Sequence, residues 1–125
     1  MNASTSARLA IAEALQAAGL PAYPAGMGTT PLPSIVVQPD SPYLEPTTVG
    51  KGTWRVNLRL VISVQAFDTM TSLAAIEDLA ESAAIALPAG CQVQSLTMPS
   101  QQSLGEAQGS IYAAELVLSA VATKE

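Results

Sequence analysis

The stretch TWRVNLRLVISVQAF, residues 53–67, alternates apolar and other side chains more regularly than any other part of the chain. Its even-numbered positions, from Trp54 to Ala66, are all apolar, whereas the odd-numbered positions include Arg55 and Arg59. Alternate residues of a β-strand point to opposite faces of a sheet. The stretch therefore predicts one long strand, in a sheet with a buried face and a more polar face, as antiparallel sheets allow. A strand of this length either crosses a small domain completely or projects from it.

Helical periodicity precedes and follows this strand. Ile11, Leu15 and Ala18 fall on one helical face, and Gly19 with Pro21 provides a stop signal, which predicts a first helix over residues 5–19. A second helix is expected after Asp68, ending before Pro88. Its predicted apolar stripe is Leu73, Ile76, Ala80, Ala83, Ala84 and Leu87.

Three further strands are expected, over residues 34–38, 91–98 and 110–122. The order of elements is then α-β-β-α-β-β. This order predicts a single α+β domain over residues 1–125, with a mainly antiparallel sheet of about four strands and two helices packed on one face.

A long segment, PDSPYLEPTTVGKG at residues 39–52, separates two of these strands. Its prolines each lack a backbone donor, and we expect them to keep the segment out of the sheet. Tyr43, Leu44 and Val49 offer apolar contacts for which a solvated loop has no use. We interpret the segment as a projecting arm that lies on a neighbouring subunit, and the alternative is a surface loop.

The charges suggest where subunits would meet. Lys51, Arg55 and Arg59 lie close together in the sequence, and the two arginines share the polar face of the long strand. Glu77, Asp78 and Glu81 lie on or beside the polar face of the second helix. One hypothesis is charge complementarity between subunits, with the arm and basic strand face as one patch and the acidic helix as the other. The alternative is that both groups are solvated.

Composition argues against most catalytic chemistry. The chain has no histidine and one cysteine, Cys91, which leaves no Ser-His or Cys-His pair and no thiol cluster for zinc. We therefore predict no catalytic residues, no metal site and no cofactor, and expect the protein not to be an enzyme. The net charge of −5 makes specific binding of DNA phosphates unexpected. No apolar run reaches the length of a membrane helix, so no membrane association is expected.

Taken together, the pattern resembles a family. The resemblance rests on AAGLPAY at the end of the first helix, PSIVV before the long segment, VNLRLVISVQAF, the helix LAAIEDLAESAAIAL and the terminal GSIYAAELVLS. These segments, in this order, resemble the tail terminator (tail completion) proteins of long-tailed bacteriophages, over nearly the whole chain.

The resemblance implies a structural virion protein that forms a ring, typically a hexamer. Such a ring caps the tail tube at the head-proximal end, stops tube polymerisation and provides the surface for head–tail joining. Its partners would be other copies of itself, the tail tube protein and a neck or head-completion protein, with DNA passing through the lumen without specific binding. Assembly would take place in the host cytoplasm.

Two other interpretations remain open. A neck or head-closure connector component has a similar size and context. A small-molecule binding domain would instead be expected to line a pocket with Tyr23, Trp54 and Tyr112.

Overall fold

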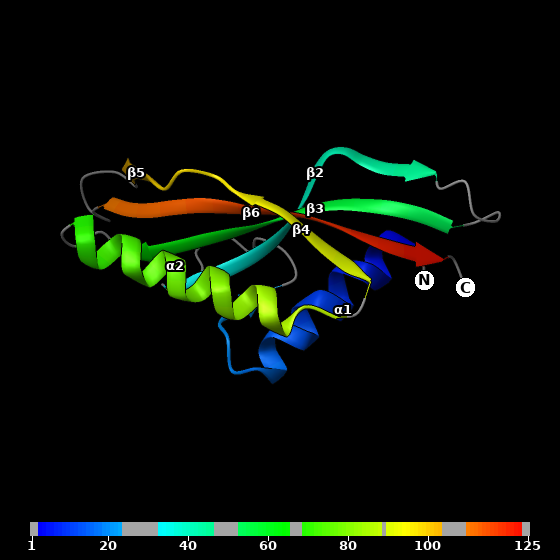
Figure 1. The fold of residues 1–125 in the computed structure, drawn as a ribbon, viewed down its shortest axis with the longest axis horizontal. Helices are drawn as coiled ribbons and strands as arrows, with labels where there is room; N and C mark the ends of the chain where they lie inside the picture. The colour runs from blue at the N-terminus through cyan, green and yellow to red at the C-terminus, as the bar shows by residue number, and fades with distance from the viewer. Residues whose placement is uncertain are drawn as a thin grey trace.

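The computed structural model describes residues 3–23, 33–46, 53–65, 69–88, 90–103 and 110–123. Within them the chain forms an α+β fold with two helices and a six-stranded sheet, which confirms the predicted fold class (Figure 1). The elements are α1 (Ala3–Ala17), β1 (Ala22–Tyr23), β2 (Ser34–Pro46), β3 (Thr53–Gln65), α2 (Thr69–Ala86), β4 (Cys91–Leu96), β5 (Ser100–Ser103) and β6 (Ser110–Thr123).

The sheet is mixed, and it has more strands than expected. Its strands lie in the order β1-β2-β3-β6-β4, and β5 also pairs with β6. β1 runs parallel to β2, whereas the other pairs are antiparallel. The predicted count of about four strands and the order α-β-β-α-β-β were therefore wrong in detail, because β1 and β5 were missed. A two-residue strand has no detectable period, and all four residues of β5 are polar, so neither shows an apolar alternation.

β3 and β6 form the centre of the sheet and pair along the whole length of β3. β3 has 13 residues, which corresponds to about 43 Å, and Figure 1 shows it running along the long axis of the molecule. Its even-numbered residues from Val56 to Val64 are buried, as the alternation predicted. Opposite them lie the even-numbered residues of β6, including Leu116 and Leu118.

Both helices pack against this even-numbered face. Ile11 and Leu15 of α1, and Ile76 and Ala83 of α2, belong to one apolar core together with the even-numbered side chains of β3 and β6. We call the opposite side, which carries the odd-numbered residues of β3 and β6, the second face. Neither described helix packs its core residues against the second face.

Helix α1 ends two residues earlier than predicted, and its end shows why Gly19 is needed. Gly19 has a φ of 83°, a conformation that L side chains rarely adopt. Its N–H donates to the carbonyl of Gln16 at 2.9 Å, and the N–H of Leu20 donates to the carbonyl of Leu15 at 3.0 Å. This pair of bonds is a Schellman motif, which satisfies the last carbonyls of the helix.

The segment predicted as an arm is, as far as residue 46, part of a strand. β2 continues through Pro39 to Pro46 and pairs with β3, from Pro39 opposite Leu58 to Pro46 opposite Trp54. The prediction that prolines exclude this segment from the sheet was wrong, because proline is tolerated on edge strands and at bulges. β1 pairs with β2 at Ile35 and Val36, and a register shift interrupts the β2–β3 ladder between Pro39 and Leu44. Residues 47–52 lie outside the described residues.

Candidate subunit interface

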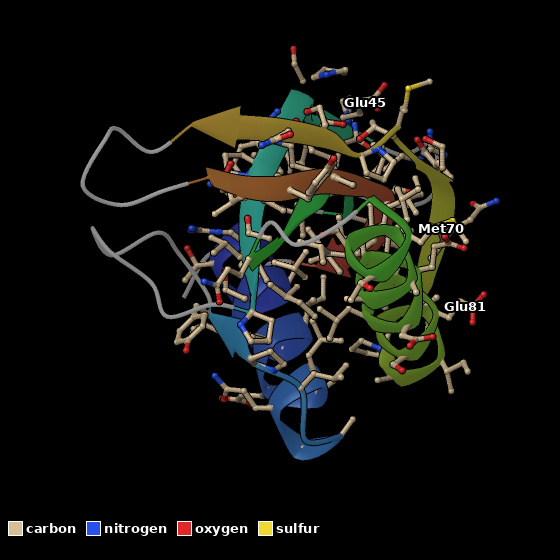
Figure 2. The ribbon with its side chains drawn as sticks, turned by 90° about the vertical axis from the view of Figure 1, so that its left-hand side faces the viewer. Glu45, Met70 and Glu81 are labelled. Atoms are coloured by element: carbon tan, nitrogen blue, oxygen red, sulfur yellow. The ribbon has the colours of Figure 1, made fainter. Side chains whose placement is uncertain are left out.

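The outer side of α2 carries acidic and large apolar side chains together. Glu77, Asp78 and Glu81 are exposed there. Met70 and Ile85 are also exposed, by 79% and 86%, although both are large and apolar. The helix contains no basic residue that could compensate its carboxylates. Figure 2 shows Glu81 pointing away from α1 and the sheet, so α2 presents a surface that is both acidic and apolar.

A second surface lies on the second face, where β3 begins and β6 ends. Arg55 of β3 is exposed and lies directly opposite Val121 of β6, which is 57% exposed. Directly opposed residues of an antiparallel pair point to the same face of the sheet. We call Arg55 and Val121 the sheet-end pair. Among the described residues Arg55 forms no ion pair, although Glu45 of β2 is its direct cross-strand partner on the other side.

Arg59 shares the second face with Arg55, as predicted, but it is engaged within its own subunit. Its Nη1 lies 3.1 Å from Oε2 of Glu115 on β6. Its Nη2 also donates, at 3.4 Å, to Oε1 of Gln38 on β2. The predicted basic surface therefore reduces, in the described residues, to Arg55. Sequence reasoning missed this because Glu115 is 56 residues from Arg59 along the chain.

The remaining predicted arm residues are placed differently from one another. Tyr43 is half-buried and packs against the core of its own subunit, so little of it is left for a neighbour. Leu44 is 40% exposed and lies opposite Val56. Val49 and Lys51 lie outside the described residues. Of the arm residues that the structure describes, Leu44 is the one with the exposure expected of a contact.

A buried amide that sequence reasoning overlooked holds this end of β2 in place. Asn57 is 8% exposed, and its Nδ2 donates to the carbonyl of Pro42 at 2.7 Å and to Oε1 of Glu45 at 2.6 Å. These two bonds span the register shift in β2 and fix the segment next to Arg55. The available signal was a single amide between apolar residues in a long strand.

Two features of the described residues bear on metal and thiol chemistry. They contain no group of three or more His, Cys, Asp or Glu side chains placed to hold a metal ion. Cys91 is partly buried, and burial raises the pKa of its thiol, which disfavours the reactive thiolate.

The aromatic pocket expected of a small-molecule binding domain does not form. Trp54 pairs with Ala122 and Tyr112 pairs with Val64 in the β3–β6 ladder, so the two rings begin ten ladder positions, or about 33 Å, apart. Tyr23 lies on β1 opposite Val36. These three residues therefore cannot line a common small pocket.

A scan against protein-family models and a search of curated protein sequences found no significant match to this chain. Among the described residues, neither helix has the length and apolar character needed to cross a bilayer.

Proposed function

We propose that this protein is a structural virion component that assembles into a ring, most simply a hexamer, and caps the tail tube of a long-tailed bacteriophage. The observation that carries the proposal is the presence of two different exposed surfaces on one small subunit. A closed ring requires such a heterologous contact, in which one patch on each subunit meets a different patch on the next. The two surfaces differ in charge, because the outer side of α2 is acidic and the sheet-end pair is basic.

The order of elements supports the same assignment. Along the chain, α1, the strands β2 and β3, α2 and the terminal strand β6 follow in the order of the segments that resemble tail terminator proteins. In this role the ring stops tube polymerisation, offers its other side to a neck or head-completion protein, and lets DNA pass through its lumen. A net charge of −5 suits a channel that DNA crosses without binding. The protein would act at the head-proximal end of the tail, after assembly in the host cytoplasm.

Native mass spectrometry over a range of protein concentrations tests the ring. A discrete closed species, seen as an annulus by negative-stain electron microscopy, is the expected result. A continuous ladder of open oligomers would contradict a closed ring.

A second assay tests the cap. The protein is added to polymerising tail tube protein encoded by the same genome, and tube lengths are measured by electron microscopy. A terminator shortens the tubes and decorates one end of each. Rings that leave tube length unchanged but bind filled heads would instead identify a neck or head-closure component.

A further inference from the structure

We propose that Glu81 and Ile85 of α2 dock onto the sheet-end pair, Arg55 and Val121, of a second copy of this chain. This inference rests on the proposed ring and names the contact that builds it. Glu81 faces Arg55 as an ion pair, and Ile85 covers Val121 as an apolar contact. The same two surfaces are repeated on every copy, so the contact runs head to tail.

The distance between the charged and the apolar side chain is similar on the two surfaces. Glu81 and Ile85 are four residues apart on a helix, which places their Cβ atoms about 5–6 Å apart. Arg55 and Val121 are direct cross-strand partners, whose Cβ atoms lie about 4.5–5.5 Å apart. One charged group and one apolar group therefore occur at nearly the same separation on both surfaces. This match in spacing allows one ion pair and one apolar contact to form in the same interface.

The four side chains of the proposed contact are exposed in a single subunit. Ile85 and Val121 are 86% and 57% exposed, although both are branched apolar residues. Arg55 is the exposed basic residue among those described, since Arg8 and Arg59 are partly buried. Three of the exposed carboxylates, Glu77, Asp78 and Glu81, lie together on α2, and charge complementarity makes this side of the helix the proposed surface for Arg55.

A second copy, rather than the same chain, must supply the partner surface. α2 packs its inner side against the even-numbered face of the sheet and turns Glu81 and Ile85 away from it. Arg55 and Val121 belong to the second face, on the other side of the sheet. The sheet itself therefore separates the two pairs within one molecule. Figure 1 also shows the strand ends that carry the sheet-end pair at one end of the long axis, while α2 extends toward the other.

Charge reversal tests the ion pair. Arg55→Glu opposes two carboxylates across the contact, and Glu81→Arg opposes two guanidinium groups, so each variant alone should self-associate about tenfold or more weakly. A 1:1 mixture of the two variants restores opposite charges at every contact, because the copies can alternate around the ring. Wild-type-sized species containing equal amounts of both variants are the expected result in native mass spectrometry. Glu13→Arg, which makes the same charge change at an exposed acid on α1, is the matched control and should assemble normally.

A second pair of variants tests the apolar contact. Ile85→Asp should weaken self-association by a similar factor, whereas Met70→Asp should not. Met70 is also a highly exposed apolar residue of α2, but it lies fifteen positions from Ile85, about 22 Å along the helix axis. Circular dichroism and thermal melts of each variant establish that any loss of assembly is not a loss of folding.

Several results would overturn the inference, and they differ in what they imply for the ring. A wild-type ring that both charge reversals leave intact would reject this contact while the proposed function stands. Variants that fail to assemble and are not restored by mixing would also reject it. Wild-type protein that stays monomeric at all concentrations would reject self-docking, and the tube-capping assay would then decide the proposed function. Reversals that weaken tube binding without changing self-association would assign this surface to the tube protein instead.

Discussion

Substitution of Asn57 by alanine should destabilise the subunit because this one buried amide makes two partly buried hydrogen bonds. A hydrogen bond to a neutral carbonyl contributes about 1 kcal/mol and one to a carboxylate about 1.5–3 kcal/mol. Pro42 is exposed and Glu45 half-exposed, so both acceptors can return to water once the amide is removed. That compensation favours the lower end of the sum, and we expect Asn57→Ala to reduce the free energy of unfolding by about 2 kcal/mol.

Urea denaturation followed by circular dichroism measures this loss, with the midpoint expected to fall and the slope m to remain constant. For a domain of this size the same loss corresponds to a decrease of about 8 °C in melting temperature. Ser119→Ala is the matched control, because Ser119 is the cross-strand partner of Asn57 and is 6% exposed. Two variants with indistinguishable midpoints would refute the argument that these hydrogen bonds hold the end of β2 in place.

Three other substitutions or treatments have defined outcomes. Leu58 is completely buried, so Leu58→Ala should cost about 3 kcal/mol in unfolding free energy through lost packing and the cavity left behind, measured by the same denaturation assay. A Cβ at position 19 would have no atom within 4 Å, so Gly19→Ala should cost about 1–2 kcal/mol of unfolding free energy through the positive φ alone. An unchanged free energy of unfolding would contradict this. Because burial raises the pKa of the Cys91 thiol, its alkylation by iodoacetamide near pH 8 should be slower in the folded protein than in urea. The difference between the two alkylation rates should become smaller as the pH rises and the thiol of the folded protein also ionises.

The central strands and the helices could be predicted from sequence because their patterns are long. The even-numbered residues of β3 from Val56 to Val64 are buried as the alternation predicts, although Asn57 and Ser63 on the other face are buried as well. The end of β2 could not be predicted in the same way. Its prolines indicate a loop. This part of β2, however, pairs with β3 on one side only, so the backbone N–H groups of the other side are not needed for the sheet.

The candidate interface was predictable in part. Periodicity places Arg55 and Glu81 on polar faces, and both are exposed. The engagement of Arg59 was not predictable, because it depends on the register that brings Glu115 of β6 within reach. Ile85 was open to prediction, since it falls outside the apolar stripe expected for its helix and an exposed isoleucine follows directly from that position.

The two edges of the sheet also bear on how copies of this chain can meet. At one edge, β2 carries Pro39, Pro42 and Pro46, and its ladder is interrupted by a register shift. At the other edge, a register shift in β4 and the break at residues 97–99 before β5 interrupt a continuous row of backbone groups. Prolines, bulges and short strands are features that prevent edge-to-edge pairing. Association of copies through the described residues is therefore expected to use side chains on the faces of the subunit. In the proposed ring, the two surfaces on opposite sides of the sheet would meet head to tail, and no continuous intersubunit sheet is expected.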